Sequence, residues 1–355
     1  RLVSDWSSDV CSSDLLAHGG EPRQLDAAFK YLALNLVGTL LFLMAVGFIY
    51  GATGQLNFTA LALAAQRPEL AAALPVYVAL LALAFLLKAG AFPLFAWLPA
   101  SYHTLPAPVL ALMGGLLTKV GIYALLRVPG QVFVASPPLF YESLGWIALL
   151  TMVTGVLGAA YHWDLRRILA FHIVSQIGYL LLGVALASPA GTAGTLFFTL
   201  HNILAKANLF LIAGLIQVLA GHYDLRRIGG LYRARPGLAV LFLIAAFSLV
   251  GAPPSSGFWG KLLLVRETFA QERYVWGGVA LAVSLLTLYS MAKIWLEAFW
   301  KPHPGNRDLV PVAGLVPAWL AVLLLAFLTL AMGLMPEPLV RYVESAAAAL
   351  ERTAP

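Results

Sequence analysis

The stretch from Leu86 to Val128, LLKAGAFPLFAWLPASYHTLPAPVLALMGGLLTKVGIYALLRV, decides how the chain folds. It contains two apolar segments of membrane-spanning length, and each carries a lysine near its middle, Lys88 in the first and Lys119 in the second. Four prolines and one histidine, His103, lie between the two lysines. An ionised lysine at the centre of a bilayer costs on the order of 3 kcal/mol. Two such lysines beside proline-interrupted helices predict an internal path for protons or ions.

The composition of the whole chain agrees with a membrane protein. Hydrophobic residues make up 61% of it and charged residues only 11%, whereas a soluble domain has about 25% charged residues. We therefore predict an all-α, polytopic transmembrane helical bundle. Windows of about 20 apolar residues predict nine spans. They are residues 31–50, 75–97, 108–128, 144–161, 168–187, 192–220, 237–268, 275–300 and 312–335.

The net charge of +6 indicates membrane orientation rather than a nucleic-acid partner, because the arginines lie in short loops between apolar runs. When the loops are assigned to alternating sides, ten basic residues fall on one side and six on the other. The richer side is predicted to be cytoplasmic, in a multi-pass protein of the inner (plasma) membrane. Its ten residues are Arg23, Lys30, Arg166, Arg167, Arg226, Arg227, Arg233, Arg235, Lys301 and Arg307.

The two ends of the chain differ from the apolar middle. Residues 1–15 are polar, repeat Ser-Ser-Asp and resemble a translated sequencing adapter, so we expect them to make no packed contacts. Residues 16–336 are predicted to form an N-terminally truncated transmembrane domain, and residues 337–355 a tail with a short surface helix. Cys11 is the only cysteine, which excludes a disulfide or a cysteine-ligated metal site within this chain.

Three of the predicted spans are expected to be interrupted. The sixth and seventh are longer than a straight span requires, and the second contains Pro93. In the seventh, Gly251–Gly257 (GAPPSSG) cannot continue as a helix, and Ser255 or Ser256 is placed to cap a second half-helix. The second and seventh spans lie five apart and therefore run in opposite directions. Broken helices in corresponding positions indicate a transport site between inverted repeats.

Lysines supply most of the candidate chemistry. Burial favours the neutral amine, so a buried lysine can exchange a proton near the working pH. Lys261 lies about one and a half turns into the restarted half-helix, whose positive N-terminal end would act in the same direction. Snorkelling to the membrane interface is the alternative for each lysine, and Lys293 could also simply pair with Glu297. Five of the seven lysines fall inside predicted spans: Lys88, Lys119, Lys206, Lys261 and Lys293.

Histidines extend this set. His201 and Asn202 share the sixth span with Lys206, and histidine titrates near neutral pH, which suits a relay between lysines. Packing is the alternative role for His201. His172 and Ser175 are weaker candidates, and His103 has either a gating or a surface role. We expect Glu297 to be the only carboxylate within the membrane, so further acidic partners are expected upstream or on another subunit.

No phosphate-binding loop, nucleophile elbow, HExxH motif or dinucleotide fingerprint is present. The sequence therefore predicts a transporter subunit rather than an enzyme, without a cofactor and without a metal site.

Five segments resemble the proton-antiporter-like membrane subunit family, and the resemblance extends over nearly everything from about residue 26. This family includes membrane-arm subunits of complex I and the large subunits of multisubunit Na+/H+ antiporters. Residues 284–300 and the short tail are most similar to the D subunits of those antiporters. The segments are KAGAFPLFAWLP (88–99), HTLPAP (103–108), LTKVGIYALLR (117–127), HNILAKANLFLIA (201–213) and GAPPSSGFWGK (251–261).

The resemblance implies fourteen helices in a full-length member, with two inverted five-helix repeats. It implies that Lys88 and Lys261 are the lysines of the two broken helices and that Lys119 lies on the central axis. It also implies that His201 and Lys206 connect the repeats. The glutamate expected to pair with Lys88 would lie upstream of Leu16.

Three functions remain open from the sequence. The first is a subunit of a cation (Na+)/proton antiporter that moves protons through a lysine–histidine relay, with other subunits, protons and monovalent cations as partners. The second is a proton-pumping subunit of an NADH:quinone oxidoreductase or a related hydrogenase, in which redox chemistry belongs to the partners. The third is a structural membrane subunit whose channel is idle.

Overall fold

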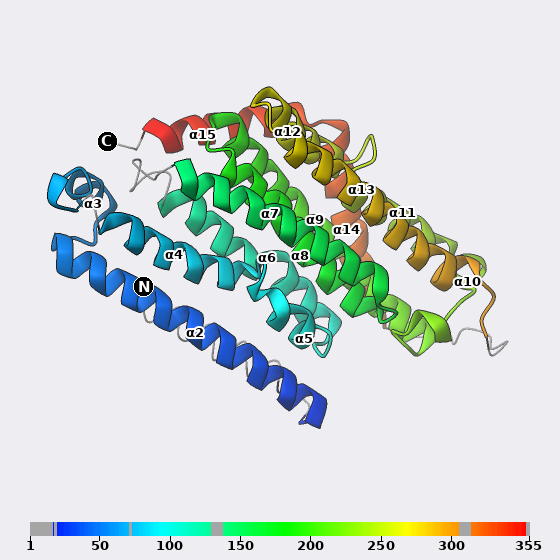
Figure 1. Ribbon diagram of the computed structural model, residues 1–355. Coiled ribbons are helices and arrows are strands. Elements are labelled where there is room, and N and C mark those ends of the chain that lie inside the picture. Colours follow the sequence, from blue (N-terminus) through cyan, green and yellow to red (C-terminus); the bar gives the residue numbers. More distant parts are fainter. Residues whose placement is uncertain (1–16, 18–19, 71–72, 129–137, 305–313, 353–355) are drawn as a thin grey trace.

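The computed structural model describes residues 17, 20–70, 73–128, 138–304 and 314–352, and this part of the chain is almost entirely helical (Figure 1). Eight of its helices are long and apolar enough to cross a membrane. Two shorter helices that follow one another, α11 and α12, occupy the position of the seventh predicted span. The predicted all-α transmembrane bundle is confirmed. The predicted adapter segment, residues 1–15, lies outside the described residues.

The described helices follow one another along the chain with short connections. The label η5 marks a short π-helix that continues α13. The longer elements are α2 (Pro22–Thr53), α4 (Leu74–Ala89), α6 (Ala107–Arg127), α7 (Pro138–Tyr161), α8 (Leu165–Ala185), α9 (Pro189–Ala220), α11 (Pro236–Val250), α12 (Ser256–Ala270), α13 (Tyr274–Ile294), α14 (Val316–Leu334) and α15 (Glu337–Arg352). The shorter ones are α3 (Phe58–Ala64), η1 (Pro68–Leu70), η2 (Leu94–Ala96), α5 (Trp97–Tyr102), η4 (Leu225–Arg227), α10 (Leu231–Ala234) and η5 (Trp295–Trp300).

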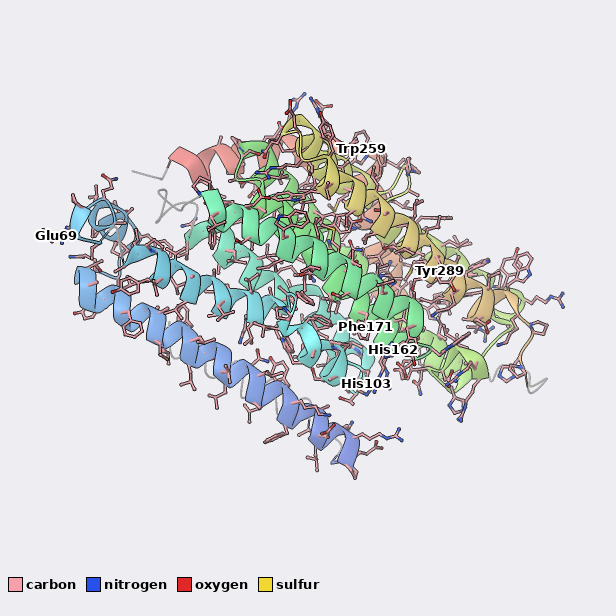
Figure 2. All side chains as sticks on the ribbon, viewed as in Figure 1. Glu69, His103, His162, Phe171, Trp259 and Tyr289 are labelled. Carbon is pink, nitrogen blue, oxygen red and sulfur yellow. The ribbon has the colours of Figure 1, made fainter. Side chains whose placement is uncertain are left out.

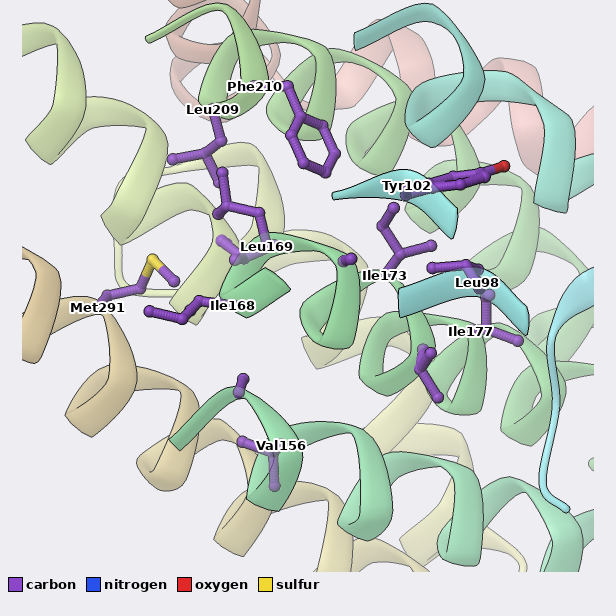
Figure 3. Packing of buried hydrophobic residues seen from close by; sticks show 14 of the residues in the cluster. Leu98, Tyr102, Val156, Ile168, Leu169, Ile173, Ile177, Leu209, Phe210 and Met291 are labelled. Carbon is purple, nitrogen blue, oxygen red and sulfur yellow. The ribbon is translucent and has the colours of Figure 1, made fainter. Parts of the chain in front are cut away.

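Helix α8 is the centre of the bundle. Its most apolar window is 94% buried inside the protein, against 22% for α2 and for α14. In Figure 1, α2 runs along one edge, and α11 and α13 lie toward the opposite edge. Figure 3 shows the apolar side chains of α8 surrounded by residues of α5, α7, α9 and α13. Those of α8 are Ile168, Leu169, Ile173 and Ile177, and their labelled neighbours are Leu98, Tyr102, Val156, Leu209, Phe210 and Met291.

The second and seventh predicted spans are interrupted, as predicted, and their breaks begin in the same way. Helix α4 ends at Gly90 and α11 at Gly251, both left-handed, with φ of +78° and +87°. The residue after each glycine, Ala91 or Ala252, donates its N–H to the carbonyl five residues back, at 3.0 Å in both cases. This is the glycine-terminated cap that satisfies the last carbonyls of a helix. The two breaks therefore begin with the same backbone conformation and the same hydrogen bond.

The predicted interruption of the sixth span is wrong. Helix α9 is continuous from Pro189 to Ala220. Its only proline is Pro189, in the first turn, where the missing N–H costs no hydrogen bond. The extra length of α9 does not require a break, because its first turns are covered by another helix. Ala193 and Phe197 in these turns pack against α15. The predicted tail helix is confirmed as α15.

Three of the loops that carry basic residues are joined at one end of the bundle. The α7–α8 and α9–α10 connections exchange backbone hydrogen bonds, from Leu165 to Tyr223 at 2.9 Å and from Leu225 to Trp163 at 3.0 Å. The Gly230 N–H donates to Lys301, which follows α13, at 2.6 Å. Three of the loops that the alternation assigns to the basic-rich side thus lie together at one end of the bundle. That this end faces the cytoplasm remains a prediction.

Candidate functional site

Lys261 lies at the second break, and its amine reaches backward rather than along its own helix. The Nζ atom donates to the carbonyls of Leu249 and Val250 at 3.2 and 2.8 Å, and to Ser284 Oγ at 3.1 Å. It also lies 4.7 Å from the centroid of the Tyr179 ring. The expected influence of the α12 N-terminus is therefore corrected. The amine binds the negative C-terminal end of α11, which stabilises a cation.

Gly251 makes this backward reach possible. A Cβ atom there would lie 2.8 Å from Cδ of Lys261, so a side chain would occupy the space of the lysine stem. The same residue supplies the left-handed turn that ends α11. One glycine therefore both ends the half-helix and leaves room for the amine to reach its last carbonyls.

His201 contacts the same break from α9. Its Nδ1 lies 2.9 Å from Ser256 Oγ and 3.4 Å from Ser248 Oγ, and the two hydroxyls are 3.0 Å apart. Gly257 allows this close approach, since a Cβ there would lie 1.8 Å from the Ser248 carbonyl oxygen. Ser255 occupies the N-cap position of α12, as predicted, but its hydroxyl donates back to Ala252 at 2.6 Å. The Ser256 hydroxyl thus contacts His201 and does not cap α12.

Lys206 is fully buried, and its amine has no hydrogen-bond partner among the described residues. It lies five residues after His201, which is about 7.5 Å along the helix axis. Asn202, one turn before Lys206, donates to the Phe198 carbonyl at 2.9 Å and leaves its own Oδ1 without a partner in the described part of the chain. Buried polar groups are normally satisfied by protein or water, so these atoms of α9 are available to bind water.

Further polar atoms in the same condition lie on the helices beside Lys206. His172 on α8 uses Nε2 to contact Ser290 Oγ at 2.9 Å, while its Nδ1 has no partner among the described residues. Such groups can hold a chain of water between the amines. Besides Arg166 at the start of α8, the residues of α6, α8 and α9 within the described ranges that have at least one buried polar atom without a hydrogen-bond partner are Thr118, His172, Ser175, Gln176, His201, Asn202, Lys206 and Asn208.

Lys119 and Lys88 lie on α6 and α4, which precede the central helix α8 in the chain. Lys119 is buried, and its amine donates to the Gly114 carbonyl of its own helix at 2.7 Å. Lys88 is half-buried in the last turn of α4, immediately before the first break. In each broken helix, a lysine amine therefore lies at the C-terminal end of the first half. Lys88 belongs to that first half, whereas Lys261 belongs to the second half and reaches back to the first.

Lys293 and Glu297 do not pair with each other. Lys293 donates to the carbonyls of Ala160 and His162 at 2.7 and 2.6 Å, where α7 ends, and Glu297 accepts from Lys301 at 2.6 Å. The pairing considered from their i,i+4 spacing is thus corrected. Carbonyls at the end of a helix lack intrahelical partners, and a cation is stabilised there. Lys293 ties α13 to α7 at the end of the bundle.

His103 follows α5 at the end of the bundle where His162 also lies (Figure 2). Its Nδ1 lies 3.1 Å from the Pro99 carbonyl, and Nη2 of Arg167 lies 3.1 Å from its Nε2. The guanidinium can only donate, so Nε2 accepts and the ring is neutral. Burial, together with the charge of Arg167, lowers the pKa of His103 from 6.5 to about 4. His103 is therefore an acceptor that joins the α5–α6 loop to α8.

We expect this contact to make the stability of the protein depend on pH. Unfolded His103 takes up a proton below pH 6.5, whereas the folded residue does so only near pH 4, so stability falls as pH decreases through that window. His103→Asn, which does not titrate, should flatten the decline of the melting temperature between pH 6.5 and 4. The same change at His222, an exposed histidine, should leave the decline as it is. Equal slopes for wild type and His103→Asn would contradict the prediction.

Several residues of this site were not predicted. Ser248, Ser284 and Tyr179 contact His201 or Lys261, but single hydroxyls in apolar helices give no signal in a sequence until their neighbours are known. The described residues contain no group of three or more His, Cys, Asp or Glu side chains that could hold a metal ion. The amines and imidazoles of this site are groups that can exchange protons.

Comparisons with known proteins show which family the chain belongs to. The family described as "NADH:quinone oxidoreductase/Mrp antiporter, TM" matches residues 10–288. The chain is 41% identical over 335 residues to the Na+/H+ antiporter D subunit of Alkalihalophilus pseudofirmus, covering 94% of this chain and 67% of that protein. It is 37% identical to the corresponding D subunit of Bacillus subtilis, covering 96% of this chain and 69% of the relative.

Solved structures give the same result. A chain of the Mrp complex from Dietzia sp. superposes with a TM-score of 0.85 at 34% identity, covering 93% of this chain and 69% of that one. A chain of respiratory complex I from Thermus thermophilus superposes with a TM-score of 0.87 at 26% identity, covering 100% and 74%. The chain belongs to the NADH:quinone oxidoreductase/Mrp antiporter transmembrane family. It spans about two thirds of the length of the two antiporter relatives.

Proposed function

We propose that this chain is part of the D subunit of a multisubunit Na+/H+ antiporter and that it moves protons along a lysine–histidine axis at mid-membrane. The two antiporter relatives reported above carry that name. The protein is then a multi-pass transporter subunit of the inner (plasma) membrane, and its partners are the other subunits of the complex, protons and monovalent cations. Any redox chemistry belongs to partner subunits.

The observation that carries the proposal is the environment of Lys206. A fully buried amine with no hydrogen-bond partner in the described structure is costly, and it lies near the middle of α9, which packs against the central helix α8. Packing alone would be served better by an apolar residue. An ionisable group inside a membrane bundle is expected to be functional.

The packing of α4 on α6, of α6 on α9 and of α9 on α12 supports an order along the axis. Protons pass from Lys88 and Lys119 to Lys206, then to His201 and its two serines, and then to Lys261 beside the second break. Water held by the unpartnered groups of α6, α8 and α9 bridges the gaps that the side chains leave. Lys293 is anchored on three backbone carbonyls at the end of α7, which favours a structural role over a place on this path.

Everted membrane vesicles provide the test. The full-length protein that carries this sequence is expressed with its partner subunits, a proton gradient is established by respiration, and a fluorescent pH probe follows the gradient. Addition of NaCl should collapse the gradient in these vesicles. Vesicles without the protein should show no collapse, because the proton path is missing. A sodium response that is the same with and without the protein would overturn the proposal.

The second candidate is a proton-pumping subunit of an NADH:quinone oxidoreductase. The superposition with a chain of complex I supports it, although at lower identity than the antiporter relatives. The same vesicles separate the two functions. If the second is correct, NADH should build a proton gradient that requires this chain, and added sodium should leave that gradient in place.

A further inference from the structure

Helix α14 contacts the second break through its backbone. A Cβ atom on Gly333 would lie 2.2 Å from the carbonyl oxygen of Pro254, 2.7 Å from the carbonyl carbon of Ser255 and 2.8 Å from the nitrogen of Ser256. No side chain fits in this space. The last turn of α14 therefore lies directly on the peptide units that join α11 to α12.

A hydrogen bond joins the same two elements. The indole Nε1 of Trp259, in the first turn of α12, donates to the Gly333 carbonyl at 2.8 Å. Helix α14 ends at Leu334, so this carbonyl is one of the last four, which have no partner within the helix. Trp259 thus caps α14 from another helix. It lies two residues before Lys261, on the half-helix that carries that amine.

The tail helix supports this contact from the outside. Val343 and Ala347 of α15 are buried against Phe197 of α9, and the partly buried Trp259 and Leu263 of α12 pack against the same cluster. Both faces of the α12 start are therefore covered, one by the end of α14 and the other by α9 and α15.

We propose that Gly333 and Trp259 are positioning residues for the proton step at Lys261. They hold the break against the end of α14 and so fix the amine on the carbonyls of Leu249 and Val250. The inference rests on the proposed function, and it assigns a role to α14, a helix that is otherwise mostly exposed at the edge of the bundle. A shift of the break moves the amine away from the negative end of α11, which weakens the stabilisation of its charged form.

Two variants in the assembled complex test this positioning role. Gly333→Ala forces the break away by the width of a methyl group, and Trp259→Phe keeps an aromatic ring but removes the donor. Gly278→Ala on α13 is the matched control, because a Cβ there meets nothing within 4 Å. Sodium-driven proton exchange is measured in everted vesicles across a range of pH, and the amount of assembled complex is measured on native gels.

We expect Gly333→Ala to slow exchange about tenfold or more, since small misplacements of a reacting group have effects of this size. Trp259→Phe should slow exchange several-fold, as the loss of one hydrogen bond predicts. Both should move the pH of half-maximal exchange to lower values, which a general loss of stability would not do. Gly278→Ala should match wild type in rate and in pH profile.

The outcomes separate this inference from the proposed function. Wild-type rates and pH profiles for both variants would overturn the positioning role while Lys261→Ala still abolished exchange. Exchange that survives Lys261→Ala would instead remove Lys261 from the path, and the proton step that Gly333 and Trp259 are proposed to position would no longer exist. If Gly333→Ala does not assemble, Trp259→Phe alone decides, because its smaller change retains the packing of the ring.

Discussion

Lys261→Ala should abolish sodium-dependent proton exchange in everted vesicles while the complex assembles normally. The amine is the only side-chain group that joins the last carbonyls of α11 to Ser284 and the Tyr179 ring among the described contacts. Without it the second break keeps no amine among the described residues, and we expect the rate to fall by about two orders of magnitude or more. Lys261→Arg should also impair exchange, because a guanidinium cannot release its proton near neutral pH.

The control for this experiment is Lys293→Ala. It removes an amine of the same type from α13, where the amine binds carbonyls at the end of α7 rather than a group at the break. We expect it to lower the melting temperature of the complex and to leave the rate per assembled complex largely unchanged. Normal exchange by assembled Lys261→Ala would exclude Lys261 from the proton path.

Lys206→Met should produce opposite changes in transport and stability. Exchange should fall below detection, because Lys206 is the amine between His201 and the lysines of the first half of the axis. The melting temperature should rise by a few degrees, because an apolar side chain of similar length replaces a buried amine that has no partner among the described residues. Replacement of buried ionic groups by packed apolar residues has stabilised other proteins by about 1–4 kcal/mol.

Lys30→Met provides the matched comparison. Lys30 is exposed on α2 and pairs with Asp26 at 2.6 Å, a surface contact that contributes little. Neither its exchange rate nor its melting temperature should change measurably. If the Lys206→Met complex is less stable than wild type, the Lys206 amine has hydrogen-bond partners in the membrane. Its burial then does not lower the stability of the protein, and the prediction is contradicted.

The spans and the breaks could be predicted from the sequence because each follows from a local rule. Runs of apolar residues place the helices, and Gly251 with the two prolines after it places the second break without knowledge of any neighbour. The sixth span shows the limit of such rules. The span was correctly predicted to be long. Whether a long helix breaks or stays continuous depends on what covers its end. The start of α9 is covered by α15, which follows much later in the chain.

The directions of the long side chains could not be predicted either. Lys261 was expected to experience the start of its own half-helix, yet the flexible stem reaches the end of the preceding one. Lys293 has a carboxylate four residues away in sequence but binds the carbonyls that end α7. In both cases the partners are backbone oxygens brought close by tertiary packing. A sequence pattern records which side chains are near in the chain, not which helix ends come to lie beside them.

Helices α8 and α14 are similarly apolar, but they differ in what surrounds them. The described part of the chain covers little of α14, and wherever lipid chains surround it they can adapt to an apolar side chain of almost any shape. The surroundings of α8 are other side chains, which leave a cavity when a residue becomes smaller and are forced apart when it becomes larger. Helices of similar hydropathy therefore differ in their freedom to vary. Apart from Gly333, which packs on the second break, α14 can exchange one apolar residue for another, while α8 can change only together with its neighbours.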